Sequence, residues 1–171
     1  IFTCYAPINS DVLNAGRKLR GIVKYGVGTD NIDLDAARAL DIPVVHCPHY
    51  GTDTVAEHAF ALMLRVARQT PKIDRHLHQK GWLWPDPNSS GVEIAGKELG
   101  IIGYGRIGKT MARLAQGFSM TCPSYDPYVT RRSCDPGHID FTSLSEVVRR
   151  SDFLSLHCVL TSETWGIIDS E

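Results

Sequence analysis

Residues 100–108 read G-I-I-G-Y-G-R-I-G, and this stretch decides the fold. An apolar strand runs directly into a G-x-G-x-x-G turn, and residues 109–115 have the pattern of a helix. Gly103 permits a tight turn, Gly105 lets the backbone approach a pyrophosphate, and Gly108 lets helix and strand pack closely. The start of the helix offers N–H groups and a positive dipole end to phosphate oxygens. The turn therefore predicts a dinucleotide site.

An acidic residue follows at the distance that such a site requires. The next predicted strand, residues 120–125, ends in Asp126, which lies 18 residues after Gly108. We expect Asp126 to accept hydrogen bonds from the adenosine ribose and to repel the additional phosphate of NADP. Arg131 and Arg132 offer an alternative, a site for that phosphate, but solvated loop residues are the preferred interpretation. The sequence therefore predicts NAD as the cofactor.

Composition restricts the remaining function classes. The chain has 171 residues, a net charge of −1 and interspersed acidic and basic residues, which argues against a nucleic acid or a membrane as partner. No apolar run is long enough to span a membrane, and no signal peptide is evident. Five scattered cysteines without a C-x-x-C pair, Cys134 among them, indicate reduced thiols and a cytoplasmic location. The seven histidines lack ligand spacing, so no metal site is predicted.

Strands and helices alternate before the glycine-rich turn. Strands are predicted at residues 1–5, 21–25 and 43–47, and helices at residues 11–19 and 34–40. Such alternation is typical of β-α-β units and a parallel sheet. A long helix then begins near Asp53, and its apolar residues lie nearly all round, which predicts burial between two domains or against a second subunit.

Further elements are predicted after the turn. A helix is expected at residues 144–150, a strand at 152–157 and the start of a helix at 165–171. Pro123 lies in a strand that should be central in the sheet, so we expect a bulge or an early end to the pairing there. We expect the sequence to be a segment of a longer protein, truncated at both ends.

Several sequence blocks together resemble the NAD-dependent D-isomer-specific 2-hydroxyacid dehydrogenases. That family includes phosphoglycerate dehydrogenases, glyoxylate/hydroxypyruvate reductases and the related C-terminal-binding-protein corepressors. The matching blocks are K-Y-G-V-G-T-D-N-I-D (24–33), I-P-V-V-H-C-P (42–48), T-V-A-E-H-A (54–59), G-K-E-L-G-I-I-G-Y-G-R-I-G (96–108), Y-D-P-Y (125–128) and S-D-F-L-S-L-H-C-V-L-T-S-E-T (151–164). The resemblance covers nearly all of the chain.

The resemblance implies an α/β fold with two parts. One is a partial Rossmann-type NAD-binding domain with a doubly wound parallel sheet, and the other is part of a flavodoxin-like substrate domain. Residues 1–70 would be the partial substrate domain, with the connecting helix from about residue 53. Residues 71–96 would be a connecting arm that contains a linker, and residues 97–171 the first part of the NAD-binding domain.

The resemblance also implies roles for particular positions. The turn at residues 26–28 would present its N–H groups to a substrate carboxylate, so Val27 and Gly28 are candidate substrate-binding residues. His46, where the family usually has asparagine, would lie close to the cleft and is a third candidate for substrate binding, with space filling as the alternative. Val55 would lie near the nicotinamide, and residues 158–164 would line the adenosine and pyrophosphate. The candidate cofactor-binding residues are Val55, Gly103, Tyr104, Gly105, Arg106, Ile107, Gly108, Asp126, Cys158, Val159 (usually proline in the family) and Thr164.

The activity that the resemblance implies is hydride transfer between NAD and a small 2-hydroxy or 2-oxo acid. The family's catalytic arginine, acid and histidine lie beyond the position that matches Glu171, so no catalytic residue is assigned and the chain alone is expected to be inactive. A homodimer through the long helix is expected. Two alternatives stay open: an NAD(H)-sensing, corepressor-like binding module, and a formate-dehydrogenase-like enzyme of the same fold.

Overall fold

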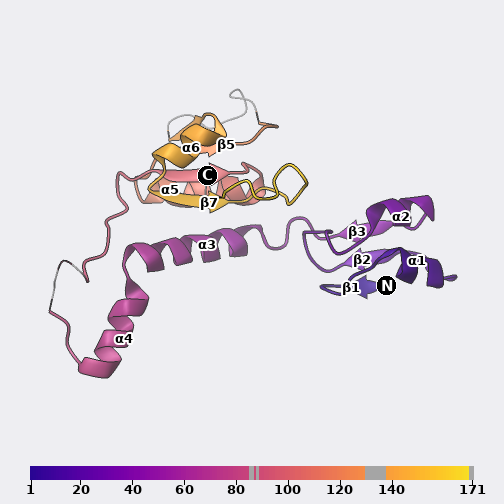
Figure 1. Ribbon diagram of the computed structural model, residues 1–171, viewed down its shortest axis with the longest axis horizontal. Coiled ribbons are helices and arrows are strands. Elements are labelled where there is room, and N and C mark those ends of the chain that lie inside the picture. The colour runs from indigo at the N-terminus through magenta and orange to yellow at the C-terminus, as the bar shows by residue number, and fades with distance from the viewer. Residues whose placement is uncertain (85–86, 88, 130–137, 170–171) are drawn as a thin grey trace. The chain divides into compact units, whose positions relative to one another are not determined.

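The computed structural model describes residues 1–84, 87, 89–129 and 138–169. The chain divides into two compact units, Ile1–Thr52 and Asp53–Glu171, whose elements Figure 1 labels. Arg131, Arg132 and Cys134 lie outside the described residues. Within the described part of the chain, no helix is long and apolar enough to cross a membrane.

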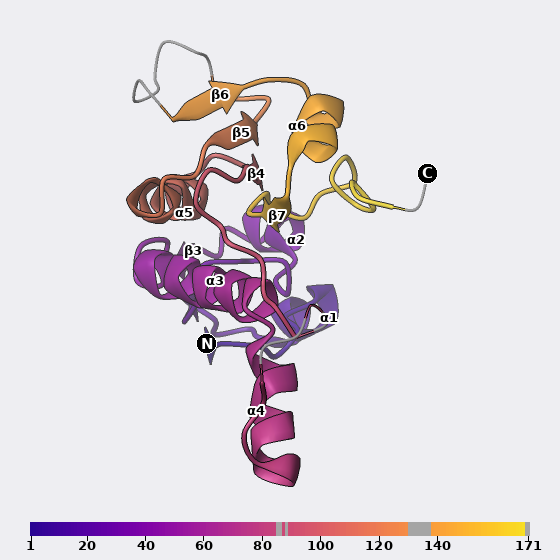
Figure 2. The same ribbon diagram turned by 90° about the vertical axis from the view of Figure 1, so that its left-hand side faces the viewer.

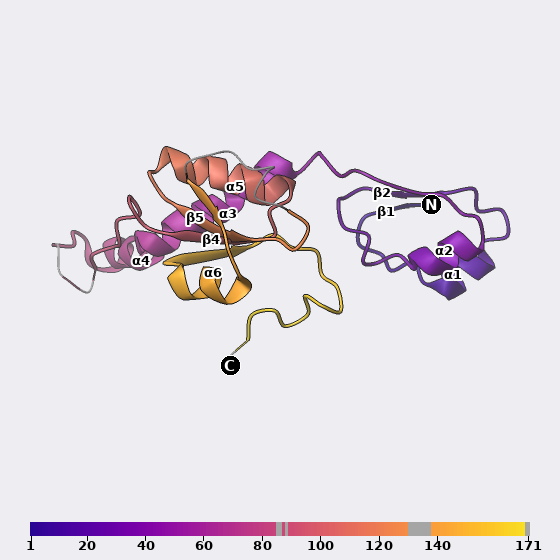
Figure 3. The same ribbon diagram turned by 90° about the horizontal axis from the view of Figure 1, so that it is seen from above.

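The first unit is a three-stranded parallel sheet with the strand order β1-β2-β3. Its strands and helices are β1 (Phe2–Thr3), α1 (Ser10–Ala15), β2 (Ile22–Lys24), α2 (Leu34–Ala39) and β3 (Val44–His46). Both helices lie on the same face of the sheet (Figure 3), and Leu13 of α1, Ile22 of β2 and Ala37 of α2 share one buried cluster. The predicted alternation of strand and helix is confirmed, although every element is shorter than predicted.

Side-chain caps fix where these two short helices begin. Oδ1 of Asn9 accepts the N–H of Val12 at 3.0 Å, and Oδ1 of Asp33 accepts the N–H of Ala36 at 2.9 Å. Each cap satisfies an N–H group that has no acceptor within the helix. The start of α2 is therefore fixed by Asp33, which is the last residue of the sequence block at 24–33.

The second unit contains a four-stranded parallel sheet with the order β6-β5-β4-β7. Its elements after residue 97 are β4 (Leu99–Ile102), α5 (Arg106–Gly117), β5 (Cys122–Tyr125), β6 (Ile139–Phe141), α6 (Leu144–Arg150) and β7 (Phe153–Leu156). Figure 2 shows α5 and α6 on opposite faces of the sheet. This order with helices on both faces is the Rossmann arrangement, so the predicted fold class is confirmed.

Two helices precede this sheet, α3 (Thr52–Ala67) and α4 (Thr70–Lys80). One face of α3 is buried against α5, where Phe60 and Met63 join Met111 and Ala115 in the main core cluster. The helix is exposed outside this face, and the exposed fraction of Val66 reaches 71%. The expected burial of the helix between two domains or against a second subunit stays a prediction. The helix α4 was not predicted; it occupies the beginning of the expected connecting arm.

Pro123 interrupts the pairing of β5 with β4 without shifting its register. Glu98 pairs with Thr121 and Ile101 with Ser124, which is the same offset on both sides of the proline. On its other side, Pro123 pairs in register with β6. Since the N–H of Thr121 points to β4, position 123 faces β4 as well, and proline has no N–H to donate there. The pairing resumes at Ser124 in the same register, so neither the predicted bulge nor the predicted early end of the pairing is found.

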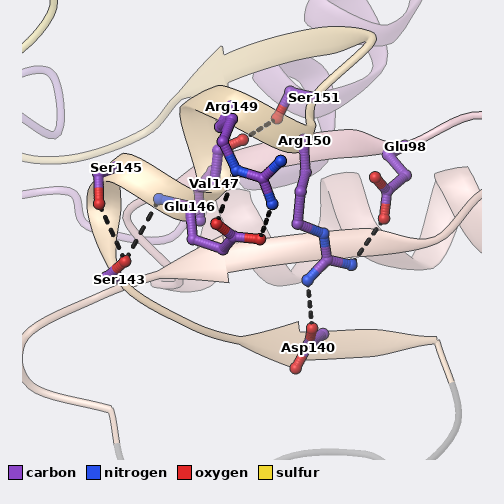
Figure 4. Close-up of polar contacts among 9 residues, drawn as sticks. All are labelled: Glu98, Asp140, Ser143, Ser145, Glu146, Val147, Arg149, Arg150 and Ser151. Carbon is purple, nitrogen blue, oxygen red and sulfur yellow. Dashed lines mark hydrogen bonds and ion pairs between the residues drawn. The ribbon is translucent and has the colours of Figure 1, made fainter.

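A cluster of charged side chains joins α6 to the sheet (Figure 4). The guanidinium of Arg150 donates to Oδ2 of Asp140 at 2.5 Å and to Oε1 of Glu98 at 2.6 Å. These two carboxylates raise the pKa of Arg150 above its ordinary value. The end of α6 is thereby tied to β6 and to the residue before β4.

The segment at 161–169 forms turns, with Gly166 at a positive φ of 67°. The predicted start of a helix at 165–171 is therefore wrong for residues 165–169, and residues 170 and 171 lie outside the described part.

Candidate cofactor site

The direction in which the sheet is built reverses between β4 and β7. After β4 the chain adds β5 and β6 on one side and then returns to place β7 on the other. Open α/β sheets bind ligands at the carboxyl ends of the strands at such a reversal. A hollow of about 250 Å³ lies there. It is lined by Ile102, Gly103, Gly105, Tyr125, Asp126, Pro127, Tyr128, His157, Cys158, Val159, Thr161, Glu163, Thr164 and Ile167.

The three glycines of the turn differ in what lies near their Cβ positions. Gly103 has φ +91°, and a Cβ there would lie 2.5 Å from the backbone nitrogen of Cys158. A Cβ on Gly108 would collide with the carbonyl oxygen of Gly103. Gly105 has nothing within 4 Å of its Cβ position, and it borders the hollow. Two glycines therefore allow close packing, and Gly105 leaves an open backbone surface for a ligand.

The helix α5 begins at this open surface, with Gly105 as its N-cap residue. The first N–H groups of a helix have no acceptors within it, and they attract anions together with the helix dipole. No acidic residue lies in the first turn of α5. The open backbone and the helix start therefore fit a pyrophosphate.

The carboxylate of Asp126 is held against the turn by two backbone groups. Oδ2 accepts the N–H of Tyr104 at 2.8 Å, and Oδ1 accepts the N–H of Tyr128 at 2.9 Å. A carboxylate has about four acceptor positions, so acceptor capacity remains for a pair of hydroxyl groups. The two bonds fix the orientation of the Asp126 carboxylate at the edge of the hollow, where its remaining acceptor positions can bind the hydroxyl groups of a ribose.

The other wall of the hollow follows β7. The N–H of His157 donates to the carbonyl of Ile102 at 2.7 Å, and its Nε2 lies 2.9 Å from Oγ of Ser155. Burial lowers the pKa of His157 below its ordinary value. His157 directly follows β7 and is bonded to a serine of that strand, so it forms part of the wall of the hollow.

Hydroxyl groups shape the loop that follows. Oγ1 of Thr164 donates to the carbonyl of Val159 at 2.6 Å, and it accepts the N–H of Thr161 at 2.7 Å. The loop closes on itself around Thr164 and needs no proline at position 159 to turn. Cys158 lies next to Gly103, whereas the side chain of Val159 is exposed.

The candidate substrate residues lie in the first unit, at the carboxyl ends of β2 and β3. Nδ1 of His46 lies 2.8 Å from the carbonyl oxygen of Val27, and the N–H of Cys47 donates to the carbonyl of Gly26 at 3.0 Å. A carbonyl only accepts, so Nδ1 of His46 donates this hydrogen bond, which orients the ring. The structure therefore brings Val27, Gly28 and His46 together on one edge of their sheet.

The predicted cofactor residues divide into two groups. Gly103, Gly105, Asp126, Cys158, Val159 and Thr164 line the hollow. Val55, Tyr104, Arg106, Ile107 and Gly108 are not among its lining residues. The ring of Tyr104 packs against Phe141 with centroids 4.9 Å apart, so only the backbone of this residue contacts the site. Sequence reasoning assigned no role to Tyr125, Tyr128 and Ile167. For Tyr125 and Tyr128, their position at the end of β5 and just after it was the signal available.

Comparison with known proteins gives concordant results. Residues 60–171 match the family described as D-isomer specific 2-hydroxyacid dehydrogenase, NAD binding domain. A relative in Mycobacterium tuberculosis, named D-3-phosphoglycerate dehydrogenase, is 40% identical over 164 residues, which are 96% of this chain and 31% of the relative.

Two solved structures are similar to nearly the whole chain. D-lactate dehydrogenase from Aquifex aeolicus, complexed with NAD and lactic acid, is 33% identical with a TM-score of 0.88; the match covers 95% of this chain and 48% of that one. NAD-dependent formate dehydrogenase from Staphylococcus aureus, in complex with NAD, is 31% identical with a TM-score of 0.86, covering 97% and 49%. The chain spans about a third to a half of the length of these proteins.

Proposed function

The chain belongs to the D-isomer-specific 2-hydroxyacid dehydrogenases, and from that premise we propose that it serves hydride transfer between NAD and a small 2-hydroxy or 2-oxo acid. One observation carries the proposal: Asp126 is held beside the glycine-rich turn at the mouth of a hollow at the strand-order reversal. This is the place and the chemistry that a dinucleotide requires.

Different residues in and around the hollow would bind different parts of NAD. The backbone from Gly103 to Gly108, at the start of α5, would hold the pyrophosphate, and Asp126 would hold the adenosine ribose. Cys158, Val159 and Thr164 would contact the adenosine part, and Val55 the nicotinamide part. When bound, NAD accepts or supplies the hydride. The negative charge of Asp126 favours NAD over NADP because NADP carries a phosphate on the same ribose.

The substrate meets the first unit through its carboxylate. The N–H groups of Val27 and Gly28 donate to the carboxylate oxygens, since glycine on either side of Val27 leaves the backbone accessible. The ring of His46 is oriented by its bond to the carbonyl of Val27, so that Nε2 is the nitrogen offered to the substrate. At Nε2, the histidine can form a hydrogen bond with the substrate.

The same proposal includes the organisation of the protein. Residues 1–70 belong to the substrate domain, residues 71–96 to the connecting arm and residues 97–171 to the NAD-binding domain. The protein is a homodimer that uses the exposed face of α3, and it works in the cytoplasm. Reduced thiols support that location, and the free cysteines among the described residues are Cys4, Cys47, Cys122 and Cys158.

A second candidate function is oxidation of formate with NAD. It is favoured by the TM-score of 0.86 to the formate dehydrogenase, close to the 0.88 found for the lactate dehydrogenase. The corepressor-like alternative differs from both because it predicts cofactor binding without turnover.

Calorimetric titration tests the cofactor part. We expect the 171-residue chain to bind NADH more tightly than NADPH, and Asp126→Ala to lose about tenfold or more in NADH affinity, as for a hydrogen bond to a charged group. Asp35→Ala is the matched control, because Asp35 is an exposed carboxylate on α2. Equal binding of NADH by wild type and Asp126→Ala would refute the assignment of Asp126.

Turnover by the full-length gene product tests the activity. We expect NADH oxidation with pyruvate, glyoxylate, hydroxypyruvate or phosphohydroxypyruvate, and no NAD reduction with formate. Formate oxidation alone would establish the second candidate. NADH binding without turnover of any of these acids would establish the binding module.

A further inference from the structure

The ammonium group of Lys24 is buried at the carboxyl end of β2. The exposed fraction of this residue is 7%. Nζ donates to the carbonyl of Cys4 and, at 2.7 Å, to Oδ1 of Asn31. Nδ2 of Asn31 in turn donates to the carbonyl of Ala6 at 2.7 Å. Lys24 thus joins the loop after β1 to the loop after β2, and both loops lie at the edge of the sheet where ligands bind.

This buried cation lacks an anionic partner among the described residues. Both of its oxygen partners, a carbonyl and an amide, are neutral. None of the ion pairs between described residues includes Lys24. The ring of Tyr5 lies 5.9 Å from Nζ and supplies only a weak attraction. Buried charges are ordinarily paired, so an uncompensated positive charge here favours an anionic ligand.

The ammonium also lies directly beside the turn at residues 26–28. A Cβ on Gly26 would lie 3.1 Å from Cε and 3.9 Å from Nζ of Lys24. Gly26 therefore gives room to the lysine side chain, and its carbonyl accepts the N–H of Cys47 from the loop after β3. All three loops at this edge of the sheet meet around the turn and the ammonium.

We propose that Lys24 is the charged component of a carboxylate site whose neutral component is the backbone of residues 26–28. Lys24 positions the turn through its bonds to Cys4 and Asn31, and its positive charge is balanced when a small carboxylate ligand binds. The inference rests on the proposed function for the kind of ligand, a 2-oxo or 2-hydroxy acid. Lys24 is a positioning residue that acts through the turn.

Binding of oxalate, a small dicarboxylate resembling a 2-oxo acid, tests the site in the full-length gene product. We expect Lys24→Met, which keeps the length of the side chain but not the charge, to weaken oxalate binding at least about tenfold by calorimetry. Lys24→Arg should retain binding within a few-fold. Lys18→Met removes the same charge from an exposed position on the first unit and should bind like wild type. The NADH affinity should be unchanged in all three variants.

A second variant keeps the test decisive if Lys24→Met does not fold. Asn31→Asp preserves the oxygen that accepts from Nζ and gives the ammonium an internal counter-charge, so we expect weaker oxalate binding by a folded protein. A purely structural lysine predicts unchanged oxalate binding in Asn31→Asp and, where it folds, in Lys24→Met. That result, or a wild type that binds no oxalate, would overturn the inference.

Failure of the inference and failure of the proposed function give different results. Oxalate binding that depends on Lys24, without reduction of any 2-oxo acid, rejects the activity and supports the anion site. Reduction of a 2-oxo acid with an unchanged KM in Lys24→Met rejects the role of Lys24 and supports the activity.

Discussion

Gly103 and Gly105 occupy the same turn but are constrained in different ways. Gly103 has a positive φ of 91°, and a Cβ there would lie 2.5 Å from the nitrogen of Cys158, a backbone atom that cannot move aside cheaply. Gly105 has open space at its Cβ position. One glycine is therefore required for folding and the other for access of a ligand to the backbone.

This contrast gives a paired prediction. We expect Gly103→Ala to lower the free energy of unfolding by about 2 kcal/mol or more, through strain and steric overlap. Gly105→Ala should leave stability nearly unchanged but weaken NADH binding, because its methyl group occupies the space of the pyrophosphate. Urea denaturation and calorimetry measure the two effects. The assignment fails if Gly105→Ala binds NADH normally or if Gly103→Ala is as stable as wild type.

His157 makes stability depend on pH. Burial lowers its pKa below the ordinary value of 6.5, so the unfolded chain takes up a proton at a higher pH than the folded chain does. As the pH falls below about 6.5, the unfolded state gains protons first and the folded state loses stability. The contribution is at most about 1.4 kcal/mol per pH unit.

The measurement is urea denaturation of wild type and His157→Gln at pH values of about 7.5 and about 5.5, on either side of the ordinary histidine pKa. We expect the loss of stability between these two conditions to be smaller in His157→Gln. His78→Gln, a change on the exposed surface of α4, serves as the control and should behave like wild type. An identical loss in His157→Gln and wild type would contradict the role of burial at this residue.

At the scale of elements, α6 depends on Arg150 for its attachment to the sheet. The guanidinium bridges Asp140 and Glu98, and the exposed fraction of its side chain is 26% (Figure 4). Arg150→Ala leaves two partly covered carboxylates without their common cation. We expect the Tm to fall by about 2–4 °C, a modest loss because the pairs are not fully buried.

Arg149→Ala provides the matched control, since Arg149 pairs with Glu146 on the exposed side of the same helix. Its Tm should stay within measurement error of wild type by differential scanning calorimetry. Equal Tm values for Arg150→Ala and Arg149→Ala would show that the link from α6 to the strands adds nothing to stability.

Local signals decided which elements could be predicted. The bounds of α6 agree with the prediction because Ser143 caps the helix, accepting the N–H of Glu146 at 3.3 Å, as an S-x-x-E sequence favours. The strand β6 has three half-buried residues and carries no comparable signal. The helix α4 was missed although Pro71 near its start and Gly81 at its end mark a helix; its polar composition obscured the pattern.

At the scale of the molecule, the candidate site contains residues that the sequence identifies and contacts that form only when distant segments pack together. The glycines and Asp126 were predictable because each has a fixed place in a β-α-β unit. The bond from Tyr104 to Asp126 was not, since it joins residues 22 apart through the packing of β4 beside β5. Lys24 was missed for the same reason: a lysine at the end of a strand looks solvated until the loops around it are placed.

An exposed apolar stripe on α3 bears on the proposed dimer. Val55, Leu62 and Val66 are 45%, 49% and 71% exposed. Their spacing of seven and four residues places them on one face of a helix with about 3.6 residues per turn. The stripe lies beside the face that packs on α5 and consists of exposed residues, so a second copy can cover it without disturbing the core of the unit. Burying such a stripe in a symmetric contact stabilises two copies of it at once.

We therefore expect the full-length gene product to sediment as a dimer at micromolar concentration, and Leu62→Glu to shift it toward monomer. A charge in the centre of the stripe loses the apolar contact and places two like charges near each other across a two-fold axis. Val148→Glu makes the same change at a 43% exposed position on α6 and should leave the dimer intact. Analytical ultracentrifugation of the three proteins decides the question, because a monomeric wild type, or a dimeric Leu62→Glu, would place any contact between subunits elsewhere than on α3.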